Sequence, residues 1–317
     1  MLYITHIYLW DRNKHCLVFL FDFFYNILCE VDNRKKKFGK RVKNVPGRMQ
    51  LNCDSRKTRQ ESYLFANQKF DVTNLMKYLE TRKKKGDHIT FFQAFLVALG
   101  KTFYNRPVLN RFVKNRRIYE HNDVSFAFVA KVAFDDKAEE MMIQCKVDPK
   151  DNIDTISKRL SEKVNKVRED AKHVEKKGAN SAMDILAKLP NIIRVPVVGF
   201  FKWTDKIGYL PDFLANDNIY YSSLILSNLG SFHFGAIHHN INEFGISSGL
   251  ATIGEVRDEE VIINGKKEVR KLVEFGANFD ERASDGFYLI KSLNLLQYIL
   301  DNPKLLEGPA DEKIEIK

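Results

Sequence analysis

Short runs in which apolar and polar residues alternate dominate the chain from residue 62 onward, and this period of two predicts β-strands. The expected strands cover residues 63–70, 124–134, 141–147, 220–226, 250–256, 261–263 and 273–279. Asn264-Gly265 separates two of these strands and is a strong signal for a tight hairpin. The runs at 124–134 and 141–147 flank a polar turn and predict a second hairpin.

Four longer segments have apolar residues at helical spacing and therefore predict α-helices. They cover residues 74–85, 91–105, 154–172 and 286–300. Thr73 and Thr90 are the expected N-caps of the first two helices, because a threonine hydroxyl accepts a hydrogen bond from a free amide of the first turn. The second helix is apolar nearly all round, which predicts that it is buried. The apolar stretch 181–214 is interrupted by prolines and predicts several short helices packed on the sheet.

Strands and helices follow one another without regular alternation or internal repeats, so the pattern predicts a layered α/β domain with a mixed sheet. The composition agrees, because 44% of the 317 residues are hydrophobic and 29% are charged, the balance of a globular protein. Disorder, collagen-like repeats and a disulfide scaffold are excluded. The four cysteines form no C-x-x-C pair, which argues against a metal site and indicates a reducing, cytoplasmic location.

The basic residues are concentrated near the N-terminus. Eleven basic residues and one acid lie between Arg34 and Arg59, and they account for the whole net charge of +10. Residues 34–61 are therefore expected to form a flexible, solvated arm, and the scarcity of aromatic residues there makes nucleic-acid binding the weaker interpretation. Residues 1–33 form an atypical N-terminal extension, whose alternative interpretation is a peripheral apolar anchor. Its apolar stretch, 16–29, is shorter than the ~20 residues that a membrane span needs, so no span is expected.

Two motifs carry the functional information. The phosphate-binding loop, the H-E-x-x-H zinc motif and the G-x-S-x-G hydrolase motif are absent. Instead, S-N-L-G at 227–230 ends an expected strand, and D-E-R-A-S-D-G at 280–286 leads into the last helix, followed by N-P-K-L-L at 302–306. Together these resemble the catalytic domain of the dihydrolipoamide acyltransferases, the core components of 2-oxoacid dehydrogenase complexes. The fingerprint of that family is S-N-x-G, then D-H-R-x-x-D-G before a helix, in the same order.

The resemblance covers residues 62–307 and leaves 308–317 as a C-terminal tail. It implies a chloramphenicol acetyltransferase-like two-layer α/β fold, a homotrimer with active sites between subunits, and acyl transfer between coenzyme A and a thiol. In that family a histidine acts as general base on the thiol, and a serine of the neighbouring subunit stabilises the oxyanion. Each effect is typically worth about a hundredfold or more in rate. An acyl-coenzyme A thioester is thus the expected substrate.

The family's residues can be carried over by position. Ser227, with Asn228 beside it, matches the serine that stabilises the oxyanion. Asp285 matches the structural aspartate that holds the histidine loop. Arg282 matches the arginine after the histidine, and Gly286 matches the glycine that begins the helix.

The position of the histidine itself is occupied by Glu281. A free glutamate titrates near ~4.3, against ~6.5 for histidine and ~8.5 for a thiol, so an ordinary carboxylate is a poor base for a thiol. Alternatively, Glu281 pairs with Arg282 or another basic side chain. Two functions therefore stay open. One is a coenzyme A-dependent acyltransferase with Glu281 as an atypical base and Ser227 at the oxyanion, and the other is an inactive trimeric scaffold or thioester-binding pseudoenzyme.

Other residues offer weaker candidates. His233, His238 and His239 follow the S-N-L-G motif, and one hypothesis is that one of them reaches the channel of a neighbouring subunit. Adjacent strand residues point to opposite faces, so we expect ordinary hydrogen-bonded histidines rather than a metal site. Asp136-Lys137-Ala138 spells the tripeptide in which lipoyl lysines occur. It lies inside the acyltransferase-like region, so no lipoyl group is expected on this chain.

Overall fold

A six-stranded mixed sheet forms the centre of the computed structural model, which describes residues 39–131, 140–173, 187–208, 210, 215 and 218–315. The strand order is β2-β9-β8-β7-β5-β6, and β7 runs parallel to both β5 and β8. The strands are β2 (Tyr63–Asp71), β5 (Val124–Lys131), β6 (Glu140–Val147), β7 (Leu224–Asn228), β8 (Gly249–Ile263) and β9 (Lys266–Asp280). Residues 1–33 and Lys137 lie outside the described part of the chain.

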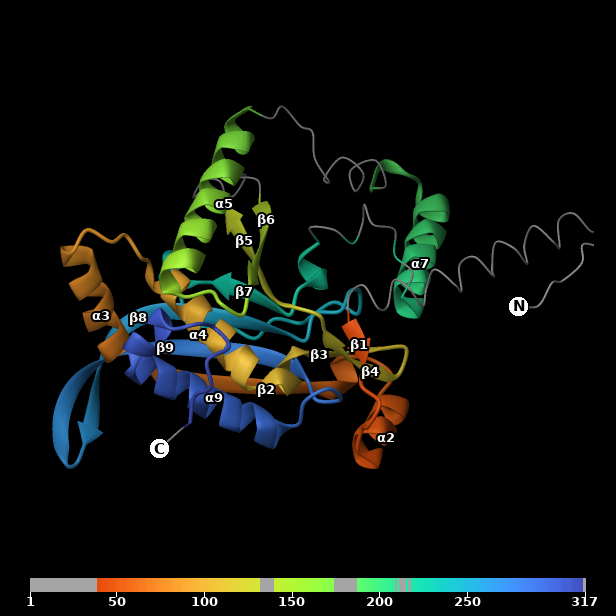
Figure 1. Ribbon diagram of the computed structural model, residues 1–317. Coiled ribbons are helices and arrows are strands. Elements are labelled where there is room, and N and C mark those ends of the chain that lie inside the picture. The colour runs from red at the N-terminus through yellow and green to blue at the C-terminus, as the bar shows by residue number, and fades with distance from the viewer. Residues whose placement is uncertain are drawn as a thin grey trace, which may run out of the picture.

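Helices cover one face of this sheet and make the fold two-layered, as the sequence predicted (Figure 1). The covering helices are α3 (Thr73–Lys84), α4 (Phe91–Asn105) and α9 (Gly286–Asp301). The core between the layers contains the rings of Phe70, Phe95 and Phe275, whose centroids lie 5.6–6.2 Å apart. α5 (Ile153–His173) contacts α4 and β6, and α7 (Asn191–Ile207) lies beside a second, smaller sheet (Figure 1).

The two threonines expected to cap helices behave differently. Thr90 caps α4 in a reciprocal capping box with Gln93, as predicted. The prediction for Thr73 is wrong, because α3 begins at Thr73 and Val72 is its N-cap. The hydroxyl of Thr73 instead accepts a hydrogen bond from the amide of Lys271 at 2.8 Å. A neighbouring strand has therefore taken the acceptor that the helix terminus would have used.

The expectation of a flexible basic arm is corrected for residues 39–61, which are folded. They form β1 (Gly39–Arg41) and α2 (Gly47–Ser55), and β1 adds to β4 (Arg117–His121) and β3 (Arg111–Lys114) in a three-stranded sheet. Cys53 of α2 is fully buried beside Val113 and Ile118. The charge count concealed this packing, because Val42, Val45, Met49 and Cys53, which lie between the basic residues, belong to one small core.

Three further expectations about elements change. In the described part of the stretch expected to contain short helices, residues 191–207 form a 17-residue helix, α7, for which Pro190 is the N-cap and in which Pro196 is tolerated. The strands expected over 250–256 and 261–263 are one strand, β8, with a register shift between Ile253 and Val256. β7 begins only at Leu224, since a 3₁₀ turn occupies the residues before it.

The long hairpin and the C-terminal residues follow from local signals. Asn264 and Gly265 have φ angles of 52° and 79°, and they connect β8 to β9 as the tight turn that the sequence predicted. The outer part of this hairpin extends past the end of β2 (Figure 1). The C-terminal tail packs back on α4, where Lys101 donates to the carbonyl of Pro309 at 2.6 Å. Within the described residues, no helix has the length and apolar character needed to cross a bilayer.

Candidate active site

Ser227 lies near the end of β7, on the face of the sheet that the helices leave uncovered. Leu224 and Leu226 of this strand face the helices and belong to the main core, whereas Ile225 packs in a separate cluster on the opposite face. Because strand residues alternate, Ser227 shares the face of Ile225. Ser227 is half-buried. The side chain of Asn228 accepts from the amide of Gly230 at 3.2 Å and thus stabilises the turn after the strand.

The turn after β9 is held by a buried ion pair. Arg282 is 4% exposed, and its guanidinium donates to both oxygens of Asp280 at 2.8 and 2.7 Å. It also donates to the carbonyl of Arg56 at 3.1 Å. Arg282 is therefore engaged by Asp280, and of the two kinds of partner suggested for Glu281 it is not the one that the structure shows.

Glu281 pairs instead with Arg56, the C-cap residue of α2. Its side chain is 31% exposed, and its backbone amide donates to the carbonyl of Ser62 at 2.9 Å. The contact joins residues 225 positions apart in the chain. The alternative of a pairing with another basic side chain is thus confirmed, with a partner from the segment expected to be a free arm.

The start of α9 explains the D-G pair of the second motif. Asp285 is the N-cap of the helix, and its carboxylate accepts from the amide of Tyr288 at 2.8 Å. The space around residue 286 does not require a glycine, because a Cβ atom there would make an ordinary contact of 3.6 Å with Leu64. The aspartate therefore has a clear structural contact, which fixes the turn that carries Glu281.

The histidines after β7 lie in the loop over the uncovered face. His238 contacts the side-chain oxygen of Asn278 at 3.2 Å and meets the ring of Phe65 edge-on at 5.4 Å. His239 is exposed, with Nδ1 3.0 Å from the carbonyl of Asn240. Hydrogen bonding of this kind is what the sequence predicted. Among the described residues, no group of three His, Cys, Asp or Glu side chains is arranged to hold a metal ion.

Ser227 and Glu281 of one chain do not meet. The sheet register aligns Ser227 with Thr252 on β8 and Thr252 with Gly276 on β9, and Glu281 lies five residues beyond Gly276. With a rise of ~3.3 Å per residue and ~4.8 Å between strands, their Cα atoms are about 19 Å apart. Any chemistry that needs both side chains therefore requires a second copy of the chain.

A buried polar cluster lies at the end of the sheet that carries the turn of Glu281. The sequence analysis did not identify it. Lys114 donates to Asp205 at 2.6 Å and to the carbonyl of Gly245 at 3.0 Å. Asp205 also accepts from the amide of Gly245 at 3.1 Å and from the hydroxyl of Tyr221. Burial lowers the pKa of Lys114 to about 8, against the opposing effect of Asp205. The only sequence signal was a single lysine ending the apolar run of β3.

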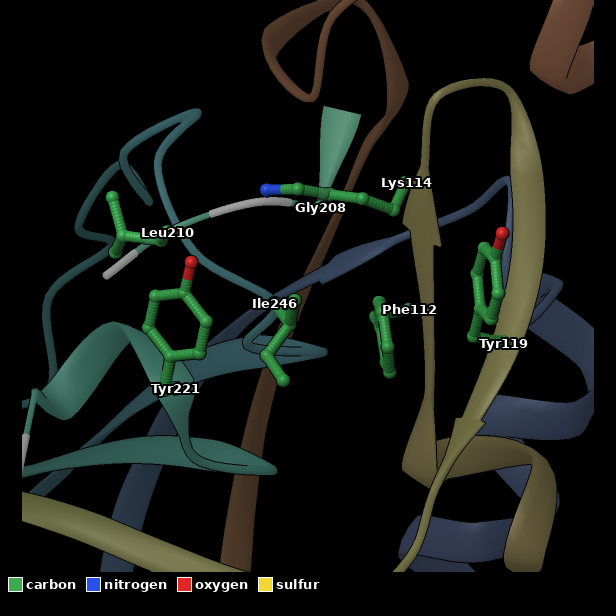
Figure 2. Close-up of a pocket in the computed structure, with 7 residues that line it drawn as sticks. All are labelled: Phe112, Lys114, Tyr119, Gly208, Leu210, Tyr221 and Ile246. Carbon is green, nitrogen blue, oxygen red and sulfur yellow. The ribbon is translucent and has the colours of Figure 1, made fainter. Parts of the chain in front are cut away.

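Figure 2 shows the hollow beside this cluster, with Lys114 extending towards Leu210 and the hydroxyl of Tyr221. Its other lining residues include Phe112 and Ile246. Arg59, only 2% exposed, donates to the carbonyl of Gly245 and thus connects the hollow to the segment that precedes β2. The hollow, the buried cluster and the turn of Glu281 therefore belong to one end of the sheet.

Several solved structures share this fold at low sequence identity. A probable dihydrolipoamide acetyltransferase from Listeria monocytogenes is 17% identical with a TM-score of 0.54, over 83% of this chain and 95% of that one. Dihydrolipoamide acetyltransferase from Azotobacter vinelandii is 14% identical with a TM-score of 0.53, over 84% and 93%. Chloramphenicol acetyltransferase is 12% identical with a TM-score of 0.51, over 83% and 98%.

These similarities establish the fold. The chain has the fold of the dihydrolipoamide acetyltransferase catalytic cores and of chloramphenicol acetyltransferase, as its two motifs predicted. The study of the Azotobacter enzyme concerned a serine, a histidine and an asparagine in the catalytic mechanism of that protein. No protein family matches the sequence, and no curated protein is similar to it.

Proposed function

We propose that this protein is an acyltransferase that moves an acyl group between coenzyme A and a thiol acceptor, with active sites between the subunits of a homotrimer. In the reaction the acceptor thiol loses its proton, and its sulfur attacks the thioester carbonyl. The tetrahedral intermediate then collapses, and coenzyme A leaves as a thiol that takes up a proton. The acceptor need not be lipoamide.

The observation that carries this proposal is the position of Ser227 on the shared fold. Ser227 lies near the end of the central strand β7. Its hydroxyl is on the uncovered face of the sheet, where a second subunit would complete a channel. An O–H donor fixed in such a place can stabilise the oxyanion of a tetrahedral intermediate, a contribution of about 10²–10³ in rate. Asp285 then acts through the backbone, because it caps α9 and holds the turn that carries Glu281.

The homotrimer is proposed because one chain separates the two candidate groups. Ser227 and Glu281 lie about 19 Å apart by strand register, whereas catalytic groups act within hydrogen-bonding reach of the substrate. The uncovered face also carries Phe65, which is 56% exposed. Native mass spectrometry should give three times the mass of the chain, and Phe65→Asp should shift the population towards monomer. A stable monomer that transfers acyl groups would contradict this arrangement.

The decisive experiment is a thioester-cleavage assay with acetyl-coenzyme A and free thiols across the neutral and mildly alkaline range. Ser227→Ala should lower kcat by about 10²-fold or more, because the oxyanion loses its donor. Ser231→Ala is the matched control, since this exposed hydroxyl donates only to the carbonyl of Asn228 and should leave kcat unchanged. Equal turnover by wild type and Ser227→Ala would overturn the assigned role.

Two substitutions test the position of Glu281. If the carboxylate acts as base or polariser, Glu281→Gln should lower kcat at least about tenfold, since general-base catalysis is worth ~10²–10⁴. Glu281→His would supply an imidazole that titrates near ~6.5, closer to neutral pH, and should raise turnover. A gain of activity in this variant would indicate a complete channel that lacks only its usual base.

The ion pair of Glu281 with Arg56 favours a second candidate, an inactive trimeric scaffold or thioester-binding pseudoenzyme. A guanidinium that engages the carboxylate leaves it less free to accept a proton from a thiol. This candidate predicts a trimer that binds acyl-coenzyme A or nothing, with no turnover at any pH in wild type and none gained by Glu281→His. Arg56→Met distinguishes the two, because releasing the carboxylate should raise turnover only in an enzyme.

A cytoplasmic location remains part of the proposal. The described cysteines, Cys53 and Cys145, are both buried and free, which agrees with a reducing compartment. No lipoyl group is expected on this chain, and Lys137 lies outside the described residues. The intact mass of the purified protein should therefore equal that of the unmodified chain.

A further inference from the structure

α7 has an exposed apolar face. Ile192 is 83% exposed and Val195 is 64% exposed, and Ile193, Phe200 and Trp203 are each at least 44% exposed. Spacings of three, seven and eight residues place these side chains on one side of the helix. Single exposed apolar residues are ordinary on a protein surface, but a contiguous group of five on one helix marks an interaction site.

The opposite side of α7 is fastened to the protein. Thr204 and Asp205 are 1% and 2% exposed, and Asp205 forms the buried pair with Lys114 of β3. The helix ends at Gly208, whose φ of 83° closes it in a left-handed cap. Because these contacts fix the rotation of the helix, its apolar side is held outward.

The charges around this face are positive. Lys202 and Lys206 of α7 are exposed, while its one acidic residue, Asp205, is neutralised internally by Lys114. Lys114 is the last residue of β3, so the β3–β4 turn with exposed Arg116 lies next to α7. Figure 1 shows α7 beside this small sheet, at the end of the molecule away from the tip of the β8–β9 hairpin.

We propose that α7 binds in the interface of an anionic lipid bilayer, with its apolar face among the acyl chains and its lysines at the headgroups. An amphipathic helix with aromatic residues on one face and lysines beside it is the usual element for such binding. Tryptophan favours the depth at which acyl chains meet headgroups, which suits Trp203. This inference does not depend on the proposed catalytic function.

Tryptophan fluorescence provides a direct test with the full chain. The sequence contains two tryptophans, so Trp10→Phe leaves Trp203 as the only one. Vesicles of phosphatidylcholine with phosphatidylglycerol should shift its emission to the blue and protect it from acrylamide quenching. Vesicles of phosphatidylcholine alone should do so much less, and about 0.5 M salt should weaken the effect by screening the charges. An unchanged spectrum with anionic vesicles at low salt would overturn the proposal.

Co-sedimentation with the same vesicles identifies the surface. Phe200→Glu, which places a charge on the apolar face, should weaken vesicle binding by roughly tenfold or more. Ile262→Glu is the matched control, because Ile262 is 75% exposed on the distant β8–β9 hairpin and should bind as wild type. Wild-type binding by Phe200→Glu would overturn the proposal and indicate another part of the chain. A change in native oligomer mass without lipid would instead assign the face to subunit contact.

Discussion

The protonation of His121 leads to a quantitative prediction about stability. His121 ends β4 and is 8% exposed, with Nε2 3.1 Å from the carbonyl of Ile246 and its ring 4.6 Å from that of Phe112. Burial lowers the pKa of His121 from 6.5 to about 4, although the nearby carboxylate of Asp123 acts in the opposite direction. The folded protein therefore keeps this imidazole neutral at a pH at which the unfolded chain binds a proton.

The sign and size of the effect follow from this difference. As the pH falls from about 6.5 to about 4, the unfolded state gains a proton that the folded state refuses, so stability decreases. A difference of about 2.5 pKa units corresponds to about 3 kcal/mol of unfolding free energy. His121→Gln retains an N–H donor for the carbonyl of Ile246 but does not titrate. Wild type should thus lose about 3 kcal/mol more than the variant between about pH 7 and pH 4.

Urea unfolding followed by circular dichroism at several pH values measures this double difference. Comparison with the variant removes the contribution of carboxylates, which titrate over the same range in both proteins. His239→Gln is the control, because this histidine is exposed. The unfolding free energy of this variant should depend on pH as that of wild type does. Parallel profiles for wild type and His121→Gln would refute the reasoning that burial keeps the imidazole neutral.

Three substitutions test individual contacts by the same urea measurement, and an unchanged midpoint would contradict the contact concerned. Thr90→Ala removes the capping box of α4 and should cost about 1 kcal/mol. Gly245→Ala should cost about 2 kcal/mol or more, because Gly245 has a φ of 88° and a Cβ atom would lie 2.3 Å from the carbonyl oxygen of Tyr220. Lys114→Met leaves the carboxylate of Asp205 buried without its cation and should cost about 3–5 kcal/mol.

The N-cap prediction was correct for one threonine and wrong for another, and the difference has a physical cause. Thr90 caps its helix because its partners, Gln93 and the first-turn amides, are neighbours in the chain. Thr73 has the same local signal, but the amide of Lys271 reaches its hydroxyl from β9. A local pattern predicts a contact only where no residue distant in sequence competes for the same atom.

The candidate site was likewise predictable only in the parts that depend on neighbours in the chain. The motifs located Ser227 and the turn at Glu281, because each is a short, continuous stretch of chain. The partner of Glu281 was not predictable from them, since Arg56 arrives from a folded α2 that the charge pattern had suggested was a solvated arm.

The sequence by itself determined the order and type of most elements, the two motifs and hence the fold. Periods of 2 and 3.6 residues and helix caps depend on neighbours in the chain, so they are visible before folding. Only the tertiary structure decided that Lys114 meets Asp205, that Ser227 lies about 19 Å from Glu281, and that α7 presents its apolar side outward. These relations arise from the packing of distant segments against one another, which no local pattern encodes.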